Sequence, residues 1–308
     1  MVFDTTVCHI PADTLLEEKN VRCKGDIVIG DRSLFRRGVI TEGRVFIGEF
    51  AELKGDIVSI GDIRMDRGTR FKGNMTGDSS IFIGERSIVQ GEMNVGGDLD
   101  IGQGVQIDPS MIDSKGFINI RNPLSMIIYL LLYMLERLKD DDSEEIERFL
   151  AELDDDTAAQ TYILGSSFAF FPRSCSIDPD TIHVPGDLKI GPGCTIVGDI
   201  LSDGSVEIER GVQIFGDVRS KGTLYVGENV VINGGVKAGG DVTIHHAARI
   251  GGDVSGLNVV VTSDTIIEGV LKGSSGVQVL PEGTSAIGSD GRAKKGLDIV
   301  SAIEEMER

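Results

Sequence analysis

Apolar and polar residues alternate along most of this chain in runs of three to five residues, and glycine ends many of the runs. The alternation is clearest in residues 216–253, where Leu224 and Val226, and then Val242 and Ile244, occupy alternate positions. A period of two residues predicts β-strands with one buried face. Glycine and Gly-Asp pairs supply the tight corners that such short strands need.

The glycine-led segments repeat at a nearly constant interval. Two consecutive segments, starting at Gly216 and Gly234, are each 18 residues long. A unit of about 18 residues cannot bury its apolar face alone, so successive units must stack, with roughly 4.8 Å between hydrogen-bonded strands. The repeat therefore predicts a β-solenoid. Its expected corners in the second half of the chain are Gly186, Gly198, Gly216, Gly234, Gly252 and Gly269.

The first half of the chain carries a second set of corners with the same rhythm, which predicts an internal duplication. The segments that lead into the two sets also align, with residues 8–15 opposite residues 175–182. This alignment places Cys8 opposite Cys175 and gives the first copy about six extra residues near positions 17–22. The corners of the first set are Gly25, Gly38, Gly55, Gly73 and Gly91, with Pro109 in the next slot.

The two repeat sets determine the expected domain organisation. The predicted fold class is all-β, with two tandem β-solenoids of about 17–18 residues per coil joined by an α-helical hairpin. The end coils of a solenoid need covering, so we expect caps beside them. The expected boundaries are an N-terminal cap (1–24), a first solenoid (25–122), a helical insert (123–156), the lead-in and cap of the second copy (157–185), a second solenoid (186–285) and a C-terminal tail (286–308).

Residues 124–135 read LSMIIYLLLYML, which favours a helix that is apolar on every side and therefore buried. Residues 144–153 carry an apolar stripe at helical spacing and complete the hairpin. A helix of about 12 residues is about 18 Å long, too short for a hydrocarbon core of about 30 Å. It would pack against protein or lie on a membrane surface as an anchor. The residues expected to make this contact are Met126, Ile127, Ile128, Tyr129, Leu130, Leu131, Leu132, Tyr133, Met134 and Leu135.

Composition narrows the function classes. The formal net charge of −19 would repel the phosphates of nucleic acid. Forty-one glycines, no tryptophan and only four tyrosines are unusual for a pocket lined with aromatic side chains, so no small-molecule substrate is expected. Four dispersed cysteines indicate reduced thiols, and the start of the chain lacks a basic and then apolar leader. We expect a cytoplasmic protein, placed at the inner face of the membrane if the apolar helix is an anchor.

Recurring Ile-Gly and Val-Gly pairs, as at Ile29 and Val226, resemble the hexapeptide repeat of left-handed β-helix acyltransferases and γ-class carbonic anhydrases. Such enzymes need a histidine base or three histidine zinc ligands at the corners. The histidines of this chain do not recur between copies, and adjacent side chains on a strand point to opposite faces. We therefore expect no catalytic residue, no metal and no cofactor. The four histidines are His9, His183, His245 and His246.

Aspartate follows glycine at many corners, as at Asp26, Asp187 and Asp217. Such residues line the calcium sites of nonapeptide solenoids, but an 18-residue rhythm does not match nine. A turn aspartate can instead bond to its own backbone. We expect no calcium site.

The pattern Gly-Asp-Val-x-Ser-x-Gly-x-Leu-x-Val-Gly-x-x-Val-x-Ile, which runs from Gly216 to Ile232, resembles the repeat of the bactofilin family of polymer-forming cytoskeletal proteins. The resemblance covers both repeat sets, about two thirds of the chain. It implies right-handed β-helices that polymerise end to end without nucleotide, often beneath a membrane, and that support cell shape or position other proteins. The duplication and the insert depart from the family pattern.

The expected function is therefore non-enzymatic: self-assembly through solenoid ends into filaments or oligomers, with a second copy of the chain as the partner. One alternative is a membrane-associated scaffold that forms a discrete oligomer, and another is an enzyme of the hexapeptide class. Open ladder edges and apolar end coils supply adhesion. The expected contact residues are Phe117, Ile118, Ile120, Phe168, Phe170, Phe171, Val277 and Val279.

Overall fold

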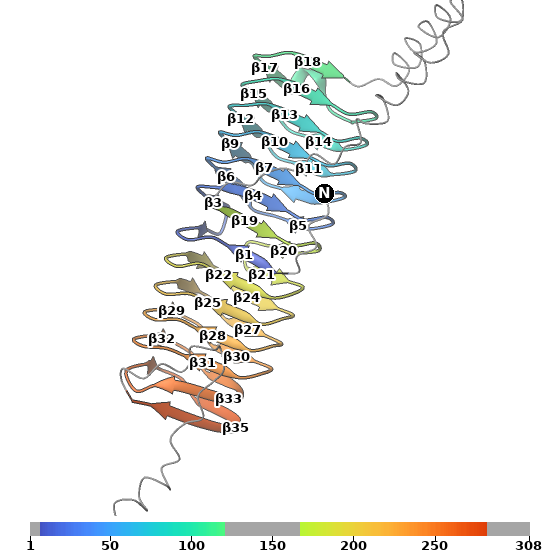
Figure 1. Cartoon of the computed structure of the whole chain (residues 1–308). Helices are drawn as coiled ribbons and strands as arrows, with labels where there is room; N and C mark the ends of the chain where they lie inside the picture. The colour runs from blue at the N-terminus through green and yellow to red at the C-terminus, as the bar shows by residue number, and fades with distance from the viewer. Residues whose placement is uncertain (1–6, 121–166, 282–308) are drawn as a thin grey trace, which may run out of the picture.

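Short parallel strands stack into three flat ladders in a computed structural model that describes residues 7–120 and 167–281. Together these ladders form one right-handed β-solenoid of about 12 turns (Figure 1). The prediction of two separate solenoids is wrong, because both copies lie in a single continuous stack. The described residues contain one 3-10 helix, Pro109–Met111, and no α-helix. The expected helical insert, with Met126 to Leu135, lies outside the described residues.

The first stack is built by the first copy and has three faces. Its first face contains β4 (Asp26–Ile29), β7 (Val45–Ile47), β10 (Ile63–Met65), β13 (Ile81–Ile83), β16 (Leu99–Ile101) and β18 (Ile118–Ile120). Its second face contains β5 (Leu34–Phe35), β8 (Glu52–Lys54), β11 (Arg70–Lys72) and β14 (Ile88–Gln90). Its third face contains β3 (Asn20–Cys23), β6 (Gly38–Thr41), β9 (Ile57–Ser59), β12 (Met75–Gly77), β15 (Met93–Val95) and β17 (Ile112–Ser114).

The second stack continues the same three faces. The first face carries β22 (Leu188–Ile190), β25 (Val206–Ile208), β28 (Leu224–Val226) and β31 (Val242–Ile244). The second carries β21 (Thr181–Val184), β24 (Asp199–Ser202), β27 (Val218–Ser220) and β30 (Val236–Ala238). The third carries β23 (Thr195–Val197), β26 (Gln213–Phe215), β29 (Val231–Ile232), β32 (Arg249–Ile250) and β34 (Ile266–Ile267). The long strands β33 (Val254–Thr262) and β35 (Leu271–Leu280) bend across the corner between the first two faces.

Alternation along each strand separates an apolar interior from an outer surface. Ile27 and Ile29 of β4 point inward, and Val45 and Ile47 of β7 lie directly above them in register. The same inward positions repeat from coil to coil and form one core cluster through both stacks. The period-two pattern in the sequence therefore predicts the interior correctly, since each coil buries its apolar face only against the next.

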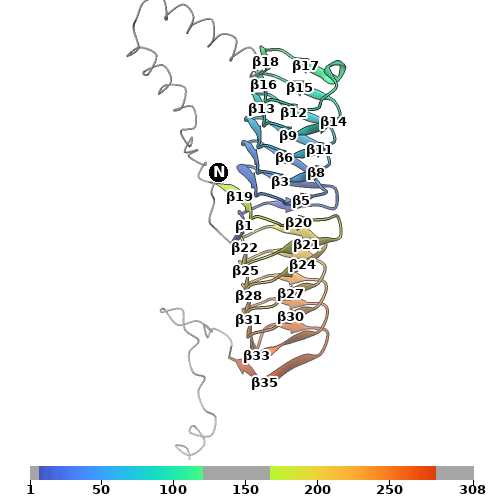
Figure 2. The same ribbon diagram turned by 90° about the vertical axis from the view of Figure 1, so that its right-hand side faces the viewer.

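The two stacks meet at a junction where strand direction reverses. Strands β1 (Cys8–Ile10) and β2 (Leu15–Leu16) open the chain but pair in parallel with β22 and β23 of the second stack. Conversely, β19 (Phe168–Phe171) and β20 (Ser176–Ile177) pair in parallel with β4 and β5 of the first stack. Each copy thus contributes the first coil of the other copy's stack, as Figures 1 and 2 show at the middle of the molecule.

Antiparallel pairs close the junction on all three faces: β1 with β19, β20 with β21 and β2 with β3. All other strand pairs of the described residues are parallel. The copies therefore meet N-terminal end to N-terminal end about a local pseudo-two-fold axis. Both outer ends of the solenoid are C-terminal coils, one formed by β17 and β18 and the other by β34 and β35. Residues 7–24, expected to be part of an end cap, lie at the centre instead.

The junction corrects the alignment of the two copies. Because β1 and β19 occupy equivalent places, Cys8 corresponds to Ala169, and Asp13 corresponds to Ser174. Both Asp13 (φ 57°) and Ser174 (φ 62°) adopt the left-handed conformation at the same corner. The two copies then match residue for residue from these lead-ins to their glycine corners. The expected equivalence of Cys8 with Cys175, and the extra residues near 17–22, are wrong.

Candidate functional site

The outer end of the first stack exposes apolar side chains around an unpaired strand edge. Phe117 is 84 % exposed, Ile118 50 % and Ile120 64 %. Within the described residues, β18 pairs with β16 and with no strand beyond it. These three predicted contact residues lie in β18 or directly before it, and Figure 1 shows β18 at one tip of the molecule.

The outer end of the second stack also exposes apolar side chains beside an unpaired strand edge. Val277 and Val279 of β35 are 45 % and 60 % exposed, and β35 pairs with β33 alone among the described strands. Val270 and Ile266 add exposed apolar surface beside them. Sequence reasoning missed these two residues, although Gly269 as the last expected corner already indicated that they belong to the final coil.

The three predicted phenylalanines at the entrance of the second copy lie at the junction. Phe171 is fully buried, and its ring lies 5.3 Å from that of Phe35, centroid to centroid. Phe170 is 4 % exposed, on the outer side of β19. These residues join the two stacks, whereas Phe117 and Val277 occupy the two tips. Phe168 is half-buried at the start of β19.

Arg37 fastens the junction from inside. Its guanidinium is buried and donates hydrogen bonds to four backbone carbonyl oxygens, and burial lowers its pKa. Two of the acceptors are Glu17 O at 2.8 Å from the first copy and Val197 O at 2.8 Å from the second. The other two are Asp178 O and Pro179 O, each at 2.9 Å. One side chain therefore satisfies carbonyl groups of both copies at the point where they meet.

The pseudo-two-fold partner of Arg37 is Gly198, which has φ +110°. A Cβ atom placed on Gly198 would lie 3.1 Å from Nη2 of Arg37. The space beside the axis thus accommodates one arginine, and the equivalent position is glycine. At this position the two halves of the junction are therefore different and complementary.

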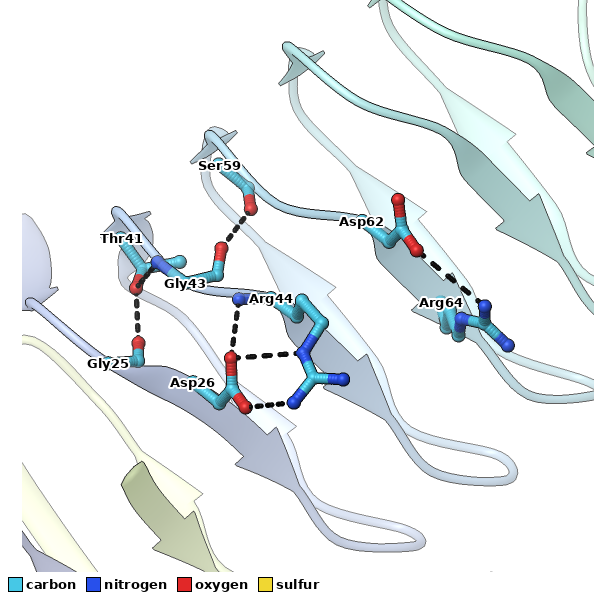
Figure 3. A network of polar contacts seen from close by, with 8 residues as sticks. All are labelled: Gly25, Asp26, Thr41, Gly43, Arg44, Ser59, Asp62 and Arg64. Atoms are coloured by element: carbon cyan, nitrogen blue, oxygen red, sulfur yellow. Dashed lines mark hydrogen bonds and ion pairs between the residues drawn. The ribbon is translucent and has the colours of Figure 1, made fainter. Parts of the chain in front are cut away.

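Aspartates at the glycine corners link neighbouring coils. The Oδ1 atom of Asp26 accepts a hydrogen bond from the backbone N of Arg44, one coil away, at 2.8 Å. The Arg44 side chain also pairs with Asp26, with Nη2 2.6 Å from Oδ2, and this hydrogen bond raises the pKa of Arg44 (Figure 3). Asp187 and Asp217 likewise accept from the backbone of the next coil, at 2.7 and 2.8 Å. These carboxylates therefore link neighbouring coils by hydrogen bonds.

Small hydroxyl side chains reinforce the same corners. Thr41 Oγ1 donates to the carbonyl oxygen of Gly25, and Ser59 Oγ donates to that of Gly43 at 2.7 Å (Figure 3). Asp62 pairs with Arg64 on the next face at 3.6 Å. The polar groups of Figure 3 therefore form a ladder along the stack.

The histidines lie apart from one another, except for one pair. His246 Nδ1 lies 3.3 Å from Oδ1 of Asp264, while the buried ring of His245 lies 4.9 Å from that of Tyr225. Burial lowers the pKa of His245 and favours its neutral form. In the described ranges, no three histidine, cysteine, aspartate or glutamate side chains are placed to hold a metal ion.

All four cysteines are buried, near or at the junction, and all are free thiols. Burial raises the pKa of Cys194 to about 11, and burial and the Cys175 thiol raise the pKa of Cys8 well above its ordinary value. The thiolate is the reactive form, so high pKa values and burial both protect these residues.

We expect thiol labelling at neutral pH to modify none of the four cysteines in the native protein and all four after denaturation, as counted by mass spectrometry. A Val7→Cys variant provides the positive control, because Val7 is 40 % exposed beside the buried Cys8. Rapid native labelling of the wild-type chain would show that the junction opens in solution.

No helix within the described ranges has the length and apolar character needed to span a bilayer.

Comparison with protein-family models, curated proteins and solved structures finds no match.

Proposed function

We propose that this chain is a non-enzymatic structural protein that assembles with itself through the outer ends of its solenoid, in the manner of the bactofilin family. The observation that carries the proposal is the pair of tips, each with an open strand edge and exposed apolar side chains such as Ile120 and Val279. An open strand edge with exposed apolar side chains can pair with another chain. A β-solenoid is compatible with a structural or oligomer-forming role.

The junction indicates how two tips would join. There, two edges of similar sequence pair in antiparallel fashion about a local two-fold axis, as His9 opposite Phe170 shows. A contact between two identical tips has the same symmetry, and such an isologous contact uses one surface twice. Since each molecule carries two tips, like-with-like pairing at both would extend the stack into a filament. The partner is a second copy of the chain; neither nucleic acid nor a small-molecule substrate is required.

The proposal predicts that substitutions at a single tip limit assembly to pairs of molecules. In the Ile118→Lys/Ile120→Lys variant, charge replaces the apolar tip of the first stack, and the molecules join only through β35. In the Val277→Lys/Val279→Lys variant they join only through β18. Changing both tips leaves single molecules. The measurement is negative-stain electron microscopy together with sedimentation velocity at several protein concentrations.

The control is Val58→Lys, which places a lysine on the outer side of β9, midway along the first stack. Val58 is 42 % exposed, so the substitution tests added charge without altering a tip. It should assemble as the wild type does. Single wild-type particles at every concentration would contradict the proposal. Loss of all assembly from one single-tip variant would show that unlike tips pair.

A further inference from the structure

Three outward-facing side chains at the centre of the first face are shielded from solvent. Phe46, Val28 and Phe170 occupy successive outer positions on β7, β4 and β19, in direct register. They are only 3 %, 3 % and 4 % exposed, and with Phe168 they form an apolar cluster separate from the core. We call these four residues the outer stripe.

The outer stripe differs from the rest of the same column. From β22 to β31, the outer residues of the first face lie in register and none of them is buried: Lys189, Glu207, Tyr225 and Thr243. Alternation places all of these side chains on the outside of the solenoid. Side chains at such positions are shielded when another segment packs over them, and apolar ones are stabilised by this burial.

The segment that precedes Cys8 is long enough to cover the outer stripe. Strand β1 borders β19, so the chain that precedes Cys8 begins beside the outer stripe. The five steps from Cys8 back to residue 3 span up to about 17 Å at roughly 3.3 Å per residue. The three strand spacings from β1 across β19 and β4 to β7 amount to about 14 Å. Phe3 can therefore reach Phe46, with Val2 beside it.

We propose that residues 1–6 pack across the outer stripe as an intramolecular strap, with Val2 and Phe3 against Phe46 and Val28. The strap starts at β1 in the second stack and crosses onto β4 and β7 of the first. It therefore adds a contact between the two stacks on the outside, whereas Arg37 joins the two copies in the interior.

Because the chain contains no tryptophan, Phe3→Trp introduces a single fluorescent reporter into the otherwise unchanged chain. The strap predicts blue-shifted emission and protection from iodide quenching, both lost on denaturation. Adding Phe46→Ser removes the ring against which Phe3 is proposed to pack and should shift the emission towards that of tryptophan in water. The matched control is Phe215→Ser, an exposed phenylalanine on the third face, which should leave the emission unchanged.

A second measurement keeps the proposal testable if Phe46→Ser perturbs folding. Phe3→Asp in the otherwise unchanged chain should accelerate hydrogen exchange in β4, β7 and β19 and leave β28 and β31 unaffected. Water-like, freely quenched emission from Phe3→Trp in the folded protein would overturn the strap. The shielding of Phe46 and Phe170 would then be assigned to residues 121–166 instead.

Discussion

Replacing Arg37 with methionine lowers the free energy of unfolding by about 4 kcal/mol, because each part-buried carbonyl oxygen that loses its hydrogen bond to the guanidinium costs about 1 kcal/mol. Four such oxygens depend on this one guanidinium. Methionine retains much of the side-chain volume, so the loss reflects the missing hydrogen bonds rather than a cavity. Equilibrium denaturation followed by far-UV circular dichroism measures the change.

The neighbouring residue supplies the control for this result. Arg36 also bonds to Asp178, with Nη1 2.7 Å from Oδ1, but its side chain is 45 % exposed. Exposed ion pairs contribute about 0–1 kcal/mol, so Arg36→Met should have little effect. Equal losses from the two substitutions would show that the Arg37 hydrogen bonds do not hold the junction together.

Substituting alanine for Gly91 costs about 3 kcal/mol or more, since backbone atoms of the neighbouring coil must move. A Cβ atom on Gly91 would lie 1.9 Å from the carbonyl oxygen of Gly73, and Gly91 has φ +135°. Gly91 lies just before β15, which pairs with β17, so movement of this corner also disturbs those two strands. We expect a lower unfolding midpoint and faster hydrogen exchange in the outer half of the first stack.

Gly211→Ala is the matched control for Gly91→Ala. Gly211 has φ +69°, and no atom lies within 4 Å of the place its Cβ would occupy. The corresponding corner of the first copy is Phe50, with φ 56°, so the fold accepts a side chain there. The cost is then the intrinsic one of a left-handed residue, about 1–2 kcal/mol. A Gly91→Ala loss no greater than this would contradict the close packing of the corners.

Sequence periodicity predicts the local structure of each coil. Strict alternation identified the inward residues, and the spacing of glycines such as Gly73 and Gly91 identified corners where coils touch too closely for a side chain. These features repeat every coil, so a single chain displays them many times. The same periodicity is unchanged when the direction of a stack is reversed, which is why it predicted two solenoids where the structure has one.

The junction depends on residues that occur once. Cys8 and Cys175 were matched by identity, whereas the true correspondence follows backbone conformation at Asp13 and Ser174. Arg37 does not recur at the coil interval, so periodicity does not identify it. Its pseudo-two-fold equivalent, Gly198, can be recognised only after the two copies are aligned correctly. The Gly-Asp corners were expected to bond locally, but Asp26 bonds to the next coil because the stack places the backbone of Arg44 within reach.

The exchange of first coils also constrains when the protein can fold. The parallel partner of β1 is β22, which lies roughly 180 residues later in the chain. The two strands therefore cannot pair until β22 has emerged from the ribosome. Synthesis at about 5–20 residues per second makes this delay on the order of ten seconds or more. During that time the nascent first stack presents an open N-terminal edge to every other chain nearby. Pairing of two nascent chains at this edge would produce domain-swapped products, so the joining of the two copies in one polypeptide favours the correct partner by proximity.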